Sequence, residues 1–209
     1  MQHRLVNNIR YEIHHGALSE RHIAELLPLR LTVFYDYPYL FSSTPEHETK
    51  RWKAIPQQDS IILVLAYNND TLVGGLLAYA EDPAHHPVVS QLPNYNSSGS
   101  LYLELIMVVP THQNRGIERE MLSIFEPDAR NRGYTDIYDI TVVRSQHHPF
   151  GIENTHDEIL IYQNMGFKQM HLYDVWNWPT RCGVPGNEFV APIDNMVQYW
   201  HKKLPINTF

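Results

Sequence analysis

The chain has 209 residues, 43% of them hydrophobic and 19% charged, with a net charge of −7 at pH 7. This length and composition are typical of a globular protein with one substantial core, and the acidic balance argues against nucleic acid as the main partner, because phosphate binding needs clustered Lys and Arg. No apolar run approaches the roughly 18 residues of a membrane span, so we expect no membrane segment. The N-terminus lacks an apolar signal-peptide core, and the single Cys182 cannot form an internal disulfide. We therefore expect a cytoplasmic protein.

The first quarter of the chain predicts one strand and two helices. Apolar and polar residues alternate over residues 9–14, as in a half-buried strand. Ser19 has the chemistry of an N-cap, and the apolar residues that follow it recur at helical spacing, which predicts an amphipathic helix over residues 20–36. Pro38 disfavours helix at the residue before it, and a second, short helix is expected over residues 46–54.

A hairpin is predicted next. Residues 61–66 are a continuous apolar run, typical of a strand that is covered on both faces. The Asn-Asn-Asp sequence at 68–70 has turn chemistry, and residues 72–79 form the returning strand. The polar segment 81–100, rich in Pro, Asn and Ser, predicts a long loop.

The middle of the chain predicts a strand–helix–strand unit. Residues 101–109 and 137–143 are apolar runs typical of buried strands, and residues 115–132 should form the helix between them. Pro127 removes a backbone donor inside this helix and should kink or shorten it.

The last quarter predicts a helix and two strands. Residues 155–158 have the sequence of a capping box, and Gly166 is placed to close the helix that follows. Residues 167–178 and 196–201 are the predicted strands, and a proline-containing loop separates them. Strands and helices alternate over much of the chain, so the sequence predicts a single α/β domain with a mixed sheet over residues 1–209.

One segment carries the strongest functional signal. Residues 101–132 pass from a strand through a loop into a helix, and such a Gly-containing loop can bind phosphate with backbone N–H groups at a helix N-terminus. The loop resembles the pyrophosphate-binding motif of the GNAT N-acetyltransferase superfamily, which reads Arg or Gln, two residues, Gly, one residue, then Gly or Ala. Gln113 and Gly116 match, and Glu118 departs because it stands where the family has Gly or Ala.

The resemblance implies a GNAT-like mixed, splayed sheet flanked by helices, with acetyl-CoA as the acyl donor. Strand 101–109 would run parallel to strand 137–143, and the cofactor would enter where the two separate. Residues 106–108 would pair with the pantetheine amides as an added strand does, and residues 113–118 would cradle the pyrophosphate. By resemblance, the cofactor-binding residues are Ile106, Met107, Val108, Gln113, Asn114, Arg115, Gly116, Ile117 and Glu118.

The resemblance also implies two catalytic residues. Glu104 stands where superfamily members often have a general base, which is needed because an alkyl amine is mostly protonated at pH 7. Tyr162, four residues before Gly166, stands where a tyrosine protonates the departing thiolate. Strand alternation places Glu104 on the face of Tyr102 and Ile106. The alternative interpretations are a partnered core carboxylate for Glu104 and an ordinary half-buried tyrosine for Tyr162.

A narrower resemblance extends over most of the chain. The segment 34–41, with Pro-Tyr-Leu-Phe after the first helix, and a His-Pro pair after the fifth strand resemble a little-characterised branch of GNAT proteins. It indicates substrate contacts for Tyr37, Tyr39 and His148. Packing of the tyrosines and an ordinary loop histidine are the alternatives.

These features predict an acyl-CoA-dependent N-acetyltransferase that acts on a primary amine of a small molecule or peptide. One alternative is a degenerate GNAT-fold binding module that has lost CoA affinity through Glu118. Another is an interaction protein whose long loops, 81–100 and 177–194, contact a partner. The sequence contains no zinc-binding motif, so no metal is expected. Exposed aromatic residues near the C-terminus are compatible with a homodimer.

Overall fold

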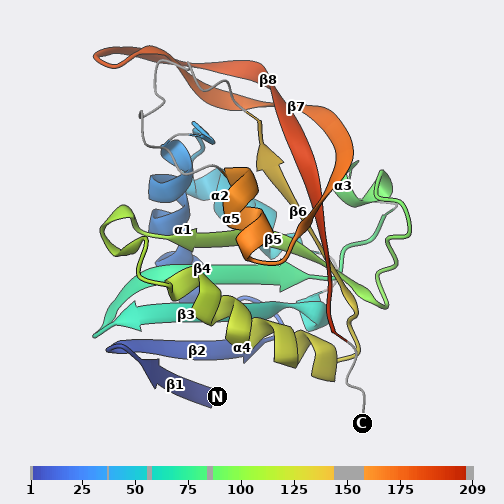
Figure 1. The fold of residues 1–209 in the computed structure, drawn as a ribbon. Helices are drawn as coiled ribbons and strands as arrows, with labels where there is room; N and C mark the ends of the chain where they lie inside the picture. Colours follow the sequence, from blue (N-terminus) through green and yellow to red (C-terminus); the bar gives the residue numbers. More distant parts are fainter. Residues whose placement is uncertain (1, 37, 56–57, 84–86, 144–157, 206–209) are drawn as a thin grey trace.

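The computed structural model of the protein describes residues 2–36, 38–55, 58–83, 87–143 and 158–205. They contain one eight-stranded sheet with the order β1-β2-β3-β4-β5-β6-β8-β7 (Figure 1). Neighbouring strands are antiparallel except β5 and β6, which run parallel, as the sequence predicted. The strands are β1 (Gln2–Val6), β2 (Ile9–His15), β3 (Ile62–Asn68), β4 (Thr71–Tyr79), β5 (Ser100–Val108), β6 (Asp136–Val142), β7 (Lys168–Val184) and β8 (Asn187–Lys203).

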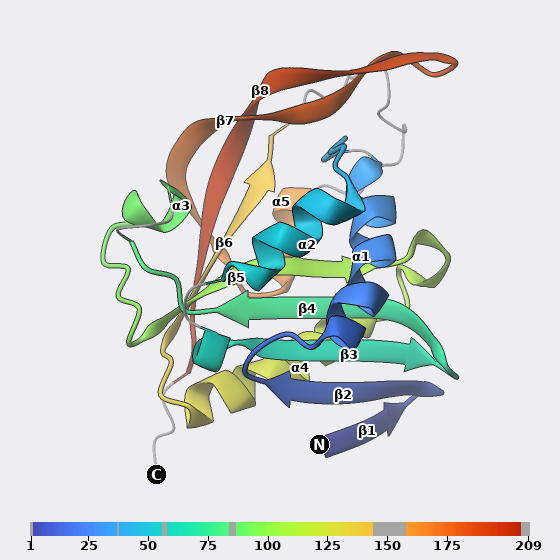
Figure 2. The same ribbon diagram turned by 180° about the vertical axis from the view of Figure 1, so that it is seen from behind.

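Helices cover both faces of this sheet. The first two helices lie on one face and the last two on the other, as the two opposite views show (Figures 1 and 2). The helices are α1 (Glu20–Tyr35), α2 (Pro45–Lys53), α3 (Pro87–Ser90), α4 (Ile117–Asn131) and α5 (Glu158–Asn164), with single 3₁₀ turns at Gln58–Ser60 and Pro110–His112. The short α3 interrupts the segment that was expected to be a loop throughout.

The helix boundaries follow from local chemistry. Ser19 Oγ accepts a hydrogen bond from the backbone N–H of His22, and the His22 ring accepts one from the backbone N–H of Ser19, which completes a capping box for α1. α4 continues past Pro127 to Asn131, so the expected shortening at this proline is not observed. Phe125 and Ala129, on either side of Pro127, are fully buried, and their packing holds this part of the helix on the sheet.

The core has two layers, one on each side of the sheet. Leu26 and Trp52 anchor α1 and α2 in one layer, and Met121 and Phe125 anchor α4 in the other. Gly75 allows α1 to pack closely, because a Cβ there would lie 2.8 Å from Leu26 Cδ2. Because both faces are covered, the central strands are apolar on both sides, as the continuous apolar runs predicted.

The sheet splits between β5 and β6. The two strands pair only near their starts, and the last paired residues are Tyr102 and Tyr138. Beyond this point β6 continues alongside β8, while β5 continues alongside β4. The predicted splayed sheet is therefore confirmed.

A β-bulge lies in β5 at Glu104. The register of β4 against β5 shifts there, so no β4 residue stands opposite Glu104. Leu105 therefore packs in the same layer as Tyr102, whereas Ile106 packs against the opposite layer. The prediction that Glu104 shares a face with Ile106 is wrong, because strict alternation takes no account of a bulge.

The C-terminal region also differs from expectation. A loop was expected over residues 177–194, but β7 and β8 form a long hairpin joined by the two-residue turn Pro185-Gly186, in which Gly186 has a φ of +87°. Pro179 and Pro192 face each other beyond the end of β6, where neither proline has to donate a hydrogen bond to a third strand.

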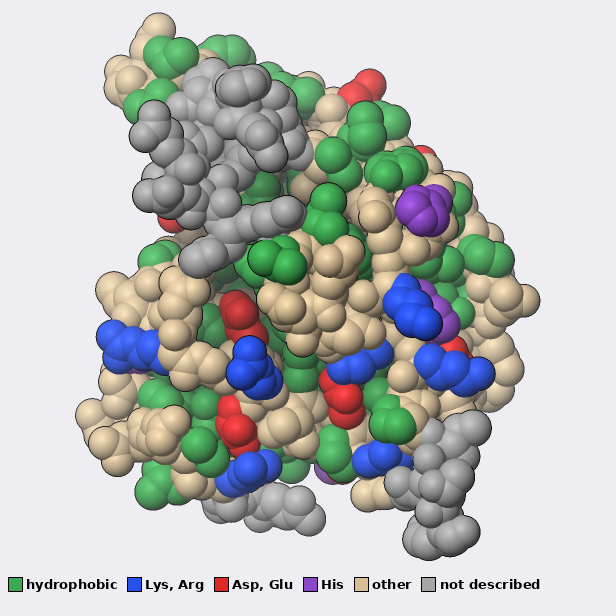
Figure 3. Space-filling model, in the orientation of Figure 1, with side chains coloured by type: hydrophobic (Ala, Val, Ile, Leu, Met, Phe, Trp, Pro, Cys, Tyr) green, Lys and Arg blue, Asp and Glu red, His purple; other side chains and the backbone are tan. Residues whose placement is uncertain are grey.

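On the face that carries α4, basic and acidic side chains are interspersed (Figure 3). Within the described part of the chain, no helix combines the length and apolar character that crossing a membrane requires. Of the capping box predicted at 155–158, Thr155 lies outside the described residues, and Glu158 is the first residue of α5.

Candidate active site

A cavity of about 240 Å³ opens where β5 and β6 separate, the place at which the sequence analysis expected the cofactor. Its walls come from α1 and α2 on one face of the sheet, from α5 on the other, and from β5, β6 and β7. Its ionisable lining residues are Arg30, Tyr39, His47, Glu48, Arg51, Tyr102, Glu104, Asp139 and Tyr162.

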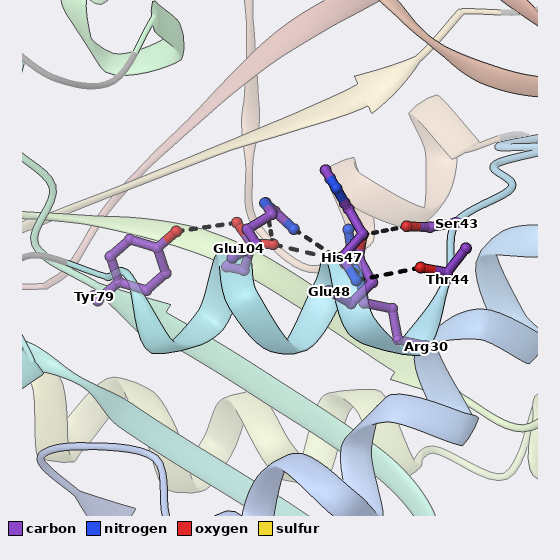
Figure 4. Close-up of polar contacts among 8 residues, drawn as sticks. Arg30, Ser43, Thr44, His47, Glu48, Tyr79 and Glu104 are labelled. Carbon is purple, nitrogen blue, oxygen red and sulfur yellow. Dashed lines mark hydrogen bonds and ion pairs between the residues drawn. The ribbon is translucent and has the colours of Figure 1, made fainter.

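Glu104 belongs to a closed ring of four charges (Figure 4). Arg51 Nη2 donates to Glu104 Oε1 at 2.5 Å, and Arg30 Nη1 lies 3.7 Å from the same oxygen. Both guanidinium groups also contact Glu48 Oε2, Arg30 Nε at 2.7 Å and Arg51 Nη1 at 3.5 Å. The second oxygen of Glu104 accepts a hydrogen bond from the Tyr79 hydroxyl at 3.1 Å.

The two carboxylates of the ring are buried, and the two guanidinium groups balance their charge. The side chain of Glu48 is 0% exposed and that of Glu104 is 1% exposed. Burial by itself raises the pKa of Glu48, but the charges of Arg30 and Arg51 outweigh it and hold the pKa below its ordinary value. Burial lowers the pKa of Arg51, but Glu104 and other neighbours outweigh it and raise the pKa. Burial and Glu104 raise the pKa of Tyr79, which keeps it a hydrogen-bond donor.

Tyr162 reaches the cavity from the opposite face of the sheet, on α5. Its hydroxyl donates to Asp139 Oδ2 at 2.7 Å, and its ring stacks on Trp200 with the ring centroids 4.9 Å apart. Asp139 Oδ1 accepts a hydrogen bond from the backbone N–H of Ile140 at 2.6 Å. Stacking and hydrogen bonding thus hold the Tyr162 hydroxyl in one position.

The predicted phosphate loop has the backbone conformation that such a loop needs. Gln113 Nε2 donates to the Val108 carbonyl at 3.1 Å, which ties the loop to the end of β5. Asn114 and Gly116 have left-handed backbones, with φ of +61° and +78°, and Gly116 is the N-cap of α4. The first N–H groups of an α-helix have no partner within the helix, and a Cβ on Gly116 would meet nothing within 4 Å. The loop therefore has open space above it for an anion.

Glu118 lies in the first turn of α4 and is partly exposed. Glu120 in the same turn pairs with Arg4 of β1 at 3.0 Å. Acidic side chains at this end of a helix complement its dipole. The departure from the family pattern thus has a structural explanation, although it adds negative charge beside the loop.

The predicted pantetheine edge lies between the loop and the cavity. Met107 and Val108 pair with β4 on one side. On the other side, among the described residues, β6 no longer pairs with β5 beyond Tyr102. The backbone of 103–108 thus presents an edge that an extended ligand could join by hydrogen bonds. Ile106 lines the cavity at this edge.

Of the predicted substrate residues, the structure places one. Tyr39 lines the cavity and packs edge-on against Phe34 of α1, with the ring centroids 4.5 Å apart. Tyr37 and His148 lie outside the described residues. Within those residues, no group of three or more His, Cys, Asp or Glu is arranged to hold a metal ion.

Sequence reasoning missed four charged residues of the cavity: Arg30, Glu48, Arg51 and Asp139. Arg30 follows apolar residues of α1, and Glu48 and Arg51 belong to a charged helix of ordinary composition. Of these four residues, only Asp139 could have been recognised from the local sequence. It is an acidic residue inside an apolar strand, and a buried carboxylate requires a hydrogen-bond partner.

Known proteins share this architecture. A ribosomal-protein-S18-alanine N-acetyltransferase from Escherichia coli superposes with a TM-score of 0.59 at 11% identity, over 95% of this chain and 99% of that one. A GNAT family acetyltransferase from Elizabethkingia anophelis with acetyl-CoA bound has a TM-score of 0.54 at 18% identity, over 95% and 100% of the two chains. An aminoglycoside 6'-N-acetyltransferase complexed with coenzyme A has a TM-score of 0.56 at 16% identity, over 95% and 99%.

Sequence comparisons complete the assignment. A search of curated proteins found no match. The model of the Acetyltransferase (GNAT) family matches residues 27–149, which is more than half of the chain and includes β5, the phosphate loop, α4 and β6. The chain therefore belongs to the GNAT acetyltransferase family.

Proposed function

We propose that the protein transfers an acetyl group from acetyl-CoA to a primary amine of a small molecule or peptide. The observation that carries this proposal is the convergence of Glu104 and Tyr162 on one cavity from opposite faces of the sheet, at the split between β5 and β6. Their proposed roles come from resemblance, and their shared cavity supports a joint role in one reaction.

Acetyl-CoA suits the surfaces around this cavity. The left-handed backbones at Asn114 and Gly116 and the N-terminus of α4 suit a pyrophosphate. The open edge of β5 suits the pantetheine amides, and it leads from the loop to the cavity. The acyl thioester would then lie beside Glu104 and Tyr162.

Glu104 would accept the first proton of the acceptor ammonium. Its two oxygens already accept hydrogen bonds from Arg51 and Tyr79, so we place a water molecule between Glu104 and the amine. Tyr162 would protonate the thiolate when it leaves, with its hydroxyl held by Asp139.

The acceptor side of the cavity favours an amine that carries an apolar or aromatic group. Aromatic rings of Phe34, Tyr39 and Phe41 line it from the α1 side, and Trp176 and Trp178 line it from β7. Such rings pack on apolar surface and attract an ammonium group through their faces. The names of two similar structures, a ribosomal-protein-S18-alanine N-acetyltransferase and an aminoglycoside 6'-N-acetyltransferase, both specify acetylation at nitrogen.

The second candidate function is a GNAT-fold binding module without CoA affinity. The observation that favours it is Glu118, whose carboxylate adds negative charge in the first turn of α4. A module of this kind would bind neither acetyl-CoA nor free CoA.

The test is an assay of the purified protein with acetyl-CoA and a panel of amines: phenethylamine, spermidine, kanamycin and a peptide with an N-terminal alanine. Released thiol is measured colorimetrically, and the acetylated amine is identified by mass spectrometry. The proposal requires stoichiometric thiol and acetylated amine with at least one acceptor. Glu12→Gln is the matched control, because Glu12 is a buried glutamate on β2 that does not line the cavity, and it should keep wild-type turnover. Failure to bind acetyl-CoA together with no product would favour the binding module.

A further inference from the structure

Asp139 is a buried carboxylate of the cavity that has no role in the scheme above except to hold Tyr162. It is 5% exposed and lines the cavity from β6. It directly follows Tyr138, the last residue of β6 that pairs with β5, and Glu104 lies two residues beyond Tyr102, the last paired residue of β5. Two carboxylates thus flank the same opening from different strands.

The two carboxylates have different surroundings. Glu104 Oε1 contacts Arg51 and Arg30, whose guanidinium groups cannot exchange a proton at neutral pH, and Glu104 Oε2 accepts a hydrogen bond from Tyr79, which does not line the cavity. Asp139 Oδ2 instead contacts the Tyr162 hydroxyl at 2.7 Å, a length suited to a strong hydrogen bond between a hydroxyl and a carboxylate. Asp139 is therefore connected directly to the proposed acid.

The proposed reaction needs more than one proton transfer. An ammonium acceptor must lose one proton before its nitrogen can attack and a second after the C–N bond has formed. The leaving sulfur must gain one proton, and the acid that supplies it must be restored before the next turnover. A carboxylate in contact with this acid is suited to the second transfer.

We propose that Asp139 is a catalytic residue that takes the second proton of the amine and delivers it to Tyr162. This inference rests on the proposed function. Glu104 accepts the first proton and releases it to solvent. The C–N bond forms, the C–S bond breaks with its electron pair on sulfur, and Tyr162 gives its proton to that sulfur. Asp139 then passes the amine proton to the Tyr162 oxygen, so both side chains return to their starting states.

The central variant is Asp139→Asn. Asparagine has nearly the same shape, keeps an oxygen for the backbone N–H of Ile140 and keeps a polar partner for Tyr162, but it cannot carry the proton. We expect kcat to fall about tenfold with KM nearly unchanged. The Kd of acetyl-CoA, measured by calorimetry, should stay within about twofold, since Asp139 is assigned no part in binding it.

The double variant tests whether the two residues act on one path. Tyr162→Phe should lower kcat about as much as Asp139→Asn, and the two changes together should lower it no further than either alone. Asp136→Asn is the matched control on the same strand. Asp136 pairs with His201 at 2.7 Å and does not line the cavity, so this variant should keep wild-type kcat.

All rates are measured with acetyl-CoA and the panel amine that gives the highest turnover. Wild-type kcat in Asp139→Asn, or losses that multiply in the double variant, would overturn the proposal. Asp139→Glu provides an independent check that keeps the carboxylate: recovery of part of the lost kcat supports the proposal, and a rate as low as that of Asp139→Asn overturns it. An active wild type with unaffected Asp139→Asn rejects the relay alone, whereas a wild type that acetylates no amine of the panel rejects the proposed function and the relay with it.

Discussion

The two ends of the proposed acetyl-CoA site are built in different ways. The pyrophosphate end is the exposed loop 113–116 together with the first turn of α4, where the groups suited to bind are backbone N–H groups and the main requirement is left-handed backbone at Asn114 and Gly116. The transfer end is a largely buried cavity whose functional groups are side chains contributed by α1, α2, β5, β6 and α5. Binding at the pyrophosphate end depends on backbone conformation, whereas acetyl transfer at the other end depends on charged side chains held in a fixed arrangement.

This difference separates the expected effects of substitutions. A change in the loop should alter the affinity for acetyl-CoA, because it changes backbone geometry or local charge. A change in the cavity should alter turnover or folding stability, because its charges neutralise one another inside the core.

The largest effect is expected for Glu104→Gln. The substitution removes the proposed base, so kcat should fall by roughly 10²- to 10⁴-fold, while the Kd of acetyl-CoA should change little. Steady-state kinetics and calorimetry measure the two quantities separately. Full activity across the pH range would show that water or another group accepts the first proton.

Glu48→Gln should mainly affect stability. It breaks the charge ring and leaves Arg30 and Arg51 to share Glu104, so the free energy of unfolding should fall by about 3 kcal/mol at pH 7. Urea unfolding provides the measurement. Glu20→Gln is the control, because its ion pair with Lys53 is exposed and should contribute little.

The effect of Glu48→Gln on the free energy of unfolding should depend on pH. The pKa of Glu48 is lowered in the folded protein, so its stabilisation is complete above the unfolded value of about 4.3 and is lost as the pH falls through the lower folded value. The difference in stability between wild type and Glu48→Gln should therefore narrow below about pH 4. A difference that stays constant from pH 7 to pH 3 would contradict the lowered pKa.

Glu118→Gly should have a smaller effect, on affinity alone. The Glu118 carboxylate stabilises the helix N-terminus by about 0.3–1 kcal/mol. At about 6 Å from a pyrophosphate charge, its repulsion of that charge would weaken binding by about 3 kcal/mol. Screening by salt and movement of the side chain reduce this repulsion. We expect a net gain on substitution of about 1–2 kcal/mol, or roughly 5- to 30-fold tighter binding. Calorimetry at two salt concentrations tests this, because the gain should shrink as salt rises.

The control for this substitution is Glu120→Gln. Glu120 lies in the same helical turn but pairs with Arg4, so its removal should change the affinity less. Equal affinity of wild type and Glu118→Gly would mean that the carboxylate points away from the phosphates.

The sequence predicted the parts of this molecule that depend on local chemistry. The cap at Ser19, the hairpin of β3 and β4 and the loop that leads from β5 into α4 are encoded within short segments, whereas the parallel pairing of β5 and β6 was expected from the family resemblance. β1 was not predicted, because Gln2–Val6 has little apolar alternation and becomes a strand by pairing with β2 across an Asn-Asn turn with positive φ.

The parts that escaped prediction depend on contacts between distant segments. The charge ring joins Arg30, Glu48, Arg51 and Glu104, which lie on three elements that only the folded sheet brings together. Asp139 and Tyr162 likewise meet only because β6 diverges from β5 and α5 packs beside the opening. The long β7–β8 hairpin was not predicted, because proline residues in a sequence usually indicate a loop. Here Pro179 and Pro192 lie opposite each other on paired strands, an arrangement that only the folded structure shows.

The central claim is that the loop and the cavity bind one molecule of acetyl-CoA, and calorimetric titration of wild-type protein tests it most directly. Gly116→Val is the matched control, since a β-branched residue does not tolerate the φ of +78° at this position. We predict one molecule of acetyl-CoA per chain with a roughly micromolar Kd, and binding at least about tenfold weaker in the control. No binding to wild type at about 1 mM acetyl-CoA, or equal affinity in the two proteins, would contradict it.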